Sequence, residues 1–305
     1  MSWEKLGRVY EPTEDYDWMK THAQLPVALH VEGDRYRLFF SGRNEENMAQ
    51  VGYLEIDITD PTDVLMITEE PILEFGPLGT FDDSGVYPSS VVTVDDEIRL
   101  YYIGWMQGKR VSYYASVGLA HSTDGGETFE KASQGPHLTR NDIDPYMTLS
   151  SDVRQRRDGT WEMWYTSATT WEEYDDGYTR PNYHIKYATS PDGLDWDRDG
   201  TVCIDYEHDG EWAIARPSIQ VTDGTYEMWY SYATEDHGYR LGYAESEDGK
   251  SWIRLDDEVG ISVSGDGWDS DLLAYPYIVQ HEGERYLFYN GNDYGNDGFG
   301  IAKQR

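Results

Sequence analysis

Cysteine and long apolar runs are scarce in this chain of 305 residues. Cys203 is the only cysteine, which excludes a disulfide within the chain. The sequence does not open with an apolar run of signal-peptide length, and no segment has the length and apolar character expected of a membrane span. These absences lead us to expect a cytoplasmic protein with no membrane partner.

Basic residues are also few. The chain has 24 Lys and Arg against 58 Asp and Glu, and its formal net charge of −34 argues against nucleic acid as a partner. Aromatic residues make up 14% of the sequence, enough for a folded core. An acid-rich, lysine-poor composition resembles that of halophilic archaeal proteins and predicts unfolding at low salt, where carboxylates repel one another. Lysine occurs only at Lys5, Lys20, Lys109, Lys131, Lys186, Lys250 and Lys303.

Five segments of the chain share one plan: a mostly apolar strand, a turn of acidic residues and glycine, and an aromatic strand. Their closing aromatics are spaced by 62, 63, 65 and 59 residues, as read from the numbering. Such a repeat predicts five similar units, each beginning with a hairpin. The segments are PVALHVEGDRYRLFF (26–40), PSSVVTVDDEIRLYY (88–102), SSDVRQRRDGTWEMWY (150–165), PSIQVTDGTYEMWY (217–230) and PYIVQHEGERYLFY (276–289).

A third strand follows in each unit, and in the middle three it runs into an Asp-box turn: STDGGETF (122–129), SPDGLDW (190–196) and SEDGKSW (246–252). We interpret these turns as structural, with the Asp side chain holding backbone amides. A fourth strand follows in four units, and the N-terminal segment 3–12 is expected to complete the fifth. The sequence therefore predicts one domain, residues 1–305: an all-β, five-bladed β-propeller of four-stranded blades closed by its N-terminal strand.

The repeats, the Asp-box turns and the inner strands that begin near proline resemble the propellers of glycoside hydrolase families 43, 32 and 62. The motifs THAQLP, GTFDDSGVYPS, AIARPS, GWDSDLLAYP and YNGNDYG resemble more closely the glycosidase-like proteins of polysaccharide gene clusters. This resemblance implies a central site for a glycan. Those enzymes often carry an acid before the inner-strand proline, where this chain instead has Leu25, Tyr87, Arg216 and Tyr275.

Catalytic candidates therefore come from the loops that feed the inner strands. Asp83 and Asp271 share the spacing D-x-x-x-Y-P, which suggests equivalent places facing one axis. Hydrolysis of a glycosidic bond usually needs two carboxyl groups, one protonated and one ionised. We predict that Asp83, Glu211 and Asp271 are the candidates for the general acid and the general base or nucleophile.

Arg216 opens an inner strand, where a buried guanidinium needs an anion or carbonyls. It either clamps a negatively charged substrate group or pairs with Glu211 or a neighbouring blade, and both interpretations stay open. His22 is a candidate proton donor, metal ligand or hydrogen-bonding core residue. The full set of predicted substrate-binding residues, chosen for a cavity that accepts an anionic sugar, is His22, Gln24, Arg43, Tyr87, Asp152, His184, Arg216, Arg240, Tyr275, Asn290 and Asn292.

We predict no cofactor: the sequence lacks a zinc-binding cluster, and Ca²⁺ bound by carboxylates stays open as an alternative but has no loop signature. We predict a glycosidase-like enzyme that acts on a glycan or an activated or anionic sugar, with a carbohydrate or sugar phosphate as its ligand. The alternatives are a non-catalytic carbohydrate-binding propeller and a glycoside phosphorylase or sugar transferase on the same fold. The sequence leaves open the sugar, the linkage and the oligomeric state.

Overall fold

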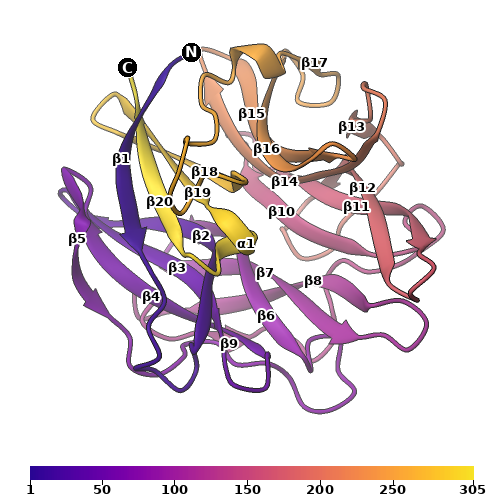
Figure 1. Ribbon diagram of the computed structural model, residues 1–305, viewed down its shortest axis with the longest axis horizontal. Coiled ribbons are helices and arrows are strands. Elements are labelled where there is room, and N and C mark those ends of the chain that lie inside the picture. Colours follow the sequence, from indigo (N-terminus) through magenta and orange to yellow (C-terminus); the bar gives the residue numbers. More distant parts are fainter.

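The computed structural model describes residues 1–305 and consists almost entirely of β-strands, which confirms the all-β prediction. Its only helical segments are a 3₁₀ turn, η1 (Asp256–Glu258), and a single turn, α1 (Asn292–Gly295). Neither is a long apolar helix of the kind that spans a bilayer. Figure 1 shows the strands arranged around a common centre.

The strands form five antiparallel sets of four. Set one contains β2 (Thr21–Glu32), β3 (Arg35–Arg43), β4 (Ala49–Asp57) and β5 (Asp60–Ile67), and set two contains β6 (Gly85–Val94), β7 (Glu97–Gln107), β8 (Tyr113–Ser122) and β9 (Glu130–Lys131). Set three contains β10 (Thr148–Gln155), β11 (Trp161–Glu173), β12 (Thr179–Ser190) and β13 (Val202–Ile204). Set four contains β14 (Glu211–Thr222), β15 (Thr225–Thr234), β16 (His237–Ser246) and β17 (Ile253–Arg254). Set five contains β18 (Ala274–His281), β19 (Glu284–Asn290), β20 (Phe299–Gln304) and β1 (Trp3–Tyr10).

The first strands of the five sets surround the centre. They lie next to one another in the order β2, β6, β10, β14 and β18, and β18 returns to β2. The sets do not form one closed hydrogen-bonded sheet: sets one and two join through a single parallel bridge, and so do sets three and four. The N-terminal strand β1 pairs with the C-terminal strand β20, as the sequence led us to expect, and Figure 1 shows the two side by side.

The hairpin turns follow from their residues. Asp223 and Gly224 connect β14 to β15 with φ values of 52° and 91°. Two successive positive φ values are typical of the tight turn whose twist matches a hairpin, and glycine accepts such values without strain. The interpretation of the acidic and glycine-rich segments as hairpin turns is therefore confirmed here.

The inner strands are bent at one recurring place. Leu25, Arg216 and Tyr275 each precede a proline and have φ values of 53°, 58° and 58°. The pairing register shifts at these points in β2, β14 and β18. A non-glycine residue in this conformation costs about 1–3 kcal/mol, and such strain is concentrated at functional sites. The bends mark where the inner strands reach the centre of the molecule.

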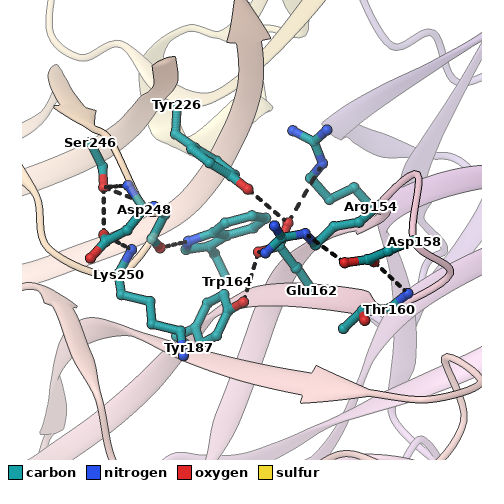
Figure 2. A network of polar contacts seen from close by, with 12 residues as sticks. Arg154, Asp158, Thr160, Glu162, Trp164, Tyr187, Tyr226, Ser246, Asp248 and Lys250 are labelled. Atoms are coloured by element: carbon teal, nitrogen blue, oxygen red, sulfur yellow. Dashed lines mark hydrogen bonds and ion pairs between the residues drawn. The ribbon is translucent and has the colours of Figure 1, made fainter. Parts of the chain in front are cut away.

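The hydrophobic core lies mainly between neighbouring sets, and the Asp-box turns take part in it. In the box at residues 246–252, Ser246 donates to Asp248 at 3.0 Å, and the Asp248 carboxylate accepts backbone amides. Trp164 of set three donates its indole N–H to the carbonyl of Gly249 at 2.6 Å. Figure 2 shows this bond together with the neighbouring contacts of the buried Glu162. The structural role predicted for the Asp box is confirmed.

Candidate functional site

A central cavity of about 710 Å³ is lined by residues near the beginnings of the five inner strands, including those at the bends of β2 and β18. Every set contributes to its wall, because residues of all five inner strands line it. These residues are Gln24 and Leu25 of β2, Tyr87 of β6, Leu149 and Ser150 of β10, Ala215 of β14 and Tyr275 of β18. The cavity therefore lies on the axis around which the sets are arranged.

Nine of the 25 residues that line the cavity are aromatic and two, Arg43 and Arg180, are arginines, whereas no Asp or Glu lines it. This is notable in a chain with 58 acidic residues. Tyrosine and tryptophan offer flat apolar faces together with hydrogen-bond donors, a combination that suits sugar rings and hydroxyls. The aromatic lining consists of Tyr87, Trp105, Tyr113, Tyr178, Tyr183, Trp212, Tyr239, Tyr275 and Tyr294.

Of the two arginines that line the cavity, Arg180 is ion-paired with Glu172 and Glu235, whereas Arg43, at the end of β3, has no ion pair. Its guanidinium donates to Gln24 Oε1 and to Asn47 Oδ1, each at 3.1 Å, and lies 6.0 Å from the centre of the Tyr87 ring. No carboxylate oxygen lies within the 4.0 Å of an ion pair. Arg43 is therefore a half-buried cation whose charge the protein leaves uncompensated.

His22 lies beside Arg43 in the cavity wall. Burial, together with the nearby guanidinium, lowers the pKa of His22 to about 4. The imidazole is therefore neutral at physiological pH, with one nitrogen able to donate and the other able to accept. Its Nδ1 lies 2.9 Å from the hydroxyl of Thr21.

The tyrosine hydroxyls of the cavity stay protonated. Burial raises the pKa of Tyr113, Tyr183, Tyr239 and Tyr275 well above the ordinary value of a phenol. The hydroxyls of Tyr113 and Tyr183 form a hydrogen bond with each other. The phenols thus supply neutral hydrogen-bond donors and are poor sources of a proton for a leaving group.

Arg216 does not line the cavity, although we predicted it to bind substrate. Its side chain, only 1% exposed, reaches across to set two and donates to the carbonyl of Ser89 at 2.5 Å. A weaker contact, 3.4 Å long, reaches the carbonyl of Pro26 in set one. The sequence left open whether Arg216 clamps a substrate group or pairs with Glu211 or a neighbouring set. In the structure its contacts are with neighbouring sets, and it has none with Glu211.

Asp152 follows the lining residues Leu149 and Ser150 in β10 but does not itself line the cavity. Its carboxylate accepts the backbone N–H of Ile219 at 2.5 Å and the hydroxyl of Ser90 at 3.3 Å. Withdrawal from solvent raises the pKa of Asp152 to about 6, against the attraction of Arg216. The carboxylate joins sets two, three and four and does not reach the cavity.

None of the three predicted catalytic acids lines the cavity. Glu211 forms two hydrogen bonds, of 2.7 and 2.9 Å, with the guanidinium of Arg254, which helps to lower its pKa. Asp83 accepts the backbone N–H of Gly79 within its own loop, and Asp271 is exposed. This placement does not supply the facing pair that the shared D-x-x-x-Y-P spacing led us to expect. Catalysis by these acids stays a prediction.

The other predicted binding residues fall into two groups. Five line the cavity: His22, Gln24, Arg43, Tyr87 and Tyr275. Four lie outside it and have structural contacts: His184 lies 3.4 Å from Asp205, Arg240 donates to the carbonyl of Asp271 at 2.8 Å, Asn290 donates to the carbonyl of Ala23 at 2.7 Å, and Asn292 accepts the N–H of Asp271 at 2.7 Å.

Several buried acids instead hold the scaffold. The closing tyrosine of four sets donates its hydroxyl to a buried or partly buried aspartate that is also paired with a cation. The groups are Tyr102–Asp82–Lys131, Tyr165–Asp144–Lys186 with Arg198, Tyr230–Asp256–Arg254 and Tyr289–Asp269–Lys5. Three of the seven lysines serve this purpose. The repeat uses these acids as counter-charges within each set.

Sequence reasoning missed part of the aromatic wall. Tyr183 and Tyr239 each stand seven residues before the serine that opens an Asp box, Ser190 and Ser246. That shared offset was a readable signal that both point to the same place in their sets. The reason they reach the cavity is that a third strand meets the next inner strand: Tyr183 forms a parallel bridge with Ala213.

Comparison with known proteins found relatives along the whole chain. Two proteins of Mycobacterium tuberculosis strains, named uncharacterized protein MT1551 and uncharacterized protein Rv1502, are each 38% identical to it over 302 residues. The match covers 99% of this chain and 99% of each relative. No family model matches the chain. These relatives are bacterial and lend no support to an archaeal origin.

Solved structures with a similar fold are glycoside hydrolases and their relatives. One described as a glycoside hydrolase has a TM-score of 0.78 at 20% identity, covering 99% of this chain and 91% of its own. A thermostable family-43 glycoside hydrolase has a TM-score of 0.68 at 16% identity, covering 96% and 91%. A structure from a study of mannoside phosphorylases and hydrolases of family 130 has a TM-score of 0.72 at 16% identity, covering 100% and 94%. The fold is that of the glycoside hydrolase propellers.

Proposed function

Since the chain belongs to the family of the mycobacterial protein Rv1502 and has the fold of glycoside hydrolase propellers, we propose that it is a glycosidase-like propeller that binds an anionic carbohydrate in its central cavity. We interpret the five strand sets as five blades in one domain, with β1 completing the last. The cyclic order of the inner strands and the pairing of β1 with β20 support this interpretation.

The observation that carries the proposal is the charge of the cavity. Arg43 lines it without a carboxylate partner, and no acidic side chain lines it at all. A half-buried guanidinium is costly to leave unpaired, and its planar donors match a carboxylate or a phosphate. A uronate or sugar phosphate would supply the missing negative charge, while the tyrosines and tryptophans would contact its ring and hydroxyls.

The test is the binding of matched sugars by titration calorimetry. Galacturonate should bind more tightly than galactose, and Arg43→Gln should remove most of that preference while leaving the circular dichroism spectrum unchanged. Arg157→Gln is the matched control, because Arg157 is exposed and has no ion-pair partner. Equal affinity of the wild type for the charged and the neutral sugar would refute the proposal.

A second candidate is phosphorolysis, in which an oxygen of dihydrogen phosphate bonds to the anomeric carbon, the glycosidic C–O bond breaks, and the leaving oxygen takes a proton from the same phosphate, so that phosphate takes the place of one carboxylate. The pairing of Arg43 with His22 in a cavity free of acids favours this candidate, because phosphate needs cationic and hydrogen-bonding partners. It predicts release of sugar 1-phosphate from an oligosaccharide that depends on added phosphate. Phosphate-independent release of reducing sugar, lost in Asp83→Asn or Asp271→Asn, would instead support hydrolysis by the predicted acids.

A further inference from the structure

We propose that the loop of residues 108–112, between β7 and β8, is an outer anion-binding subsite at the mouth of the cavity. The ligand would then be a linear acidic oligosaccharide that extends from Arg43 to this loop. This inference rests on the proposed function and adds the length and charge spacing of the ligand.

The sequence of the loop places two cations at the mouth. Gly108 and Ser112 both line the cavity, and Lys109 and Arg110 stand between them in the chain. Both cationic residues are exposed, and neither forms an ion pair. Because the residues on either side of them line the cavity, the proposal places Lys109 and Arg110 within reach of a ligand that projects out of it.

The lack of partners at Lys109 sets it apart from the other lysines. Five of the seven form ion pairs, with Asp269, Asp17, Asp82, Asp144 and Glu284. A sixth, Lys250, lies 4.9 Å above the ring of Tyr187. Lys109 has neither an acidic nor an aromatic partner, although the chain carries 58 acidic residues. Its charge is free for a ligand.

The backbone of the loop is anchored at Ser112. The backbone N–H of Ser112 donates to Thr179 Oγ1 at 2.7 Å, and the Ser112 hydroxyl donates to the carbonyl of Thr179 at 3.0 Å. Thr179 is the first residue of β12, which also carries the lining residues Arg180 and Tyr183. A loop whose backbone is anchored in this way has less conformational freedom to lose when it binds a ligand.

Arg43 belongs to set one and the loop to set two, so the two cationic places come from different sets, and aromatic side chains line the cavity together with them. Trp105 and Tyr113 line the cavity at the end of β7 and the start of β8, on either side of the loop. Charges carried on separate sugar residues fit this arrangement, whereas the two phosphates of a nucleotide sugar are adjacent to each other. The arrangement therefore favours an acidic oligosaccharide over a nucleotide sugar.

The experiment compares galacturonate, tetragalacturonate and UDP-galacturonate by calorimetry, at the lowest KCl concentration at which the wild type keeps its circular dichroism spectrum. Tetragalacturonate should bind the wild type about tenfold more tightly than galacturonate. Lys109→Gln/Arg110→Gln should remove this advantage and leave galacturonate affinity within about twofold. The control, Lys250→Gln/Arg157→Gln, makes the same charge change at exposed residues of distant turns and should alter neither affinity.

The outcomes separate this inference from the proposed function. Equal affinity of the wild type for the monosaccharide and the tetrasaccharide overturns the outer subsite and leaves the Arg43 site standing. An equal loss in the control variant also overturns it, because the effect would then come from net charge. A loop-dependent gain for UDP-galacturonate alone refutes the oligosaccharide. Failure of every anionic sugar to bind refutes both proposals.

Discussion

Replacing Asp144 with asparagine should be among the most destabilising single changes in the scaffold. The Asp144 side chain is 0% exposed and accepts hydrogen bonds from Ser167 at 2.7 Å and Tyr165 at 3.0 Å. It also faces two cations, Lys186 at 3.0 Å and Arg198 at 2.8 Å, whose side chains are only 10% and 11% exposed. Asparagine removes the negative charge and leaves both cations buried without a counter-charge.

Breaking a buried ion pair in this way costs about 3–5 kcal/mol, so we expect Asp144→Asn to lower the free energy of unfolding by about 4 kcal/mol. Urea denaturation at neutral pH would measure the loss as a lower midpoint. Asp142→Asn is the control: Asp142 is exposed and has no ion pair, so its replacement should change stability by less than about 0.5 kcal/mol. A midpoint for Asp144→Asn equal to that of the control would refute the reasoning.

Two further measurements test the cause of this effect. Adding Lys186→Met to Asp144→Asn should recover part of the loss, because one stranded cation is removed. The contacts of Asp144 lower its pKa, so its stabilising contribution is present above the ordinary aspartate pKa and is lost as pH falls through the lowered value. The gap between wild type and Asp144→Asn should therefore narrow in acid. A gap that widens would contradict this assignment.

Three other predictions follow from single features. Burial, together with the charge of Arg43, lowers the pKa of His22 to about 4, and an anion bound at Arg43 should offset the second of these causes; the affinity for a sulfated sugar should therefore rise as pH falls from about 6 towards 4, and calorimetry of His22→Gln should show no such rise. Deletion of residues 1–10 removes β1 from the edge of β20 and should lower the melting temperature of the whole domain; an unchanged value would count against closure by β1. The melting temperature should rise between low and multimolar KCl as salt screens the net charge of −34, and a constant melting temperature would refute the prediction that the protein is adapted to high salt.

The repeating features of the fold could be predicted from the sequence because each unit repeats the same local patterns of strand and turn residues. Alternating apolar residues, a turn such as Asp223-Gly224 and an Asp box require only neighbours in the chain. The central placement of Gln24, Tyr87 and Tyr275 followed because an inner strand must begin near the axis. These inferences needed no knowledge of how one set packs against the next.

The placement of Arg216 and of the predicted acids outside the cavity could not be read from the sequence, because each side chain has a choice of partners from different sets. Arg216 reaches carbonyls of sets one and two, and Glu211 pairs with Arg254, which lies 43 positions later in the chain. A shared spacing such as that of Asp83 and Asp271 fixes the place of the backbone in each unit but does not fix the direction of a side chain. In a chain so rich in acids, any loop offers carboxylates, and only the packed structure shows that none of them lines the cavity while several hold the scaffold.

The separation of charge between surface and cavity leads to a last prediction, on binding kinetics. An anionic sugar approaches a protein of net charge −34, so long-range repulsion should slow its association at low salt. Screening should then raise the association rate, the reverse of ordinary electrostatic steering. Salt should also weaken the contact with Arg43 and raise the dissociation rate. Stopped-flow measurements with galacturonate over the KCl range in which the protein stays folded would separate the two rates. An association rate that falls with added salt would mean that Lys109 and Arg110 at the mouth outweigh the field of the whole protein.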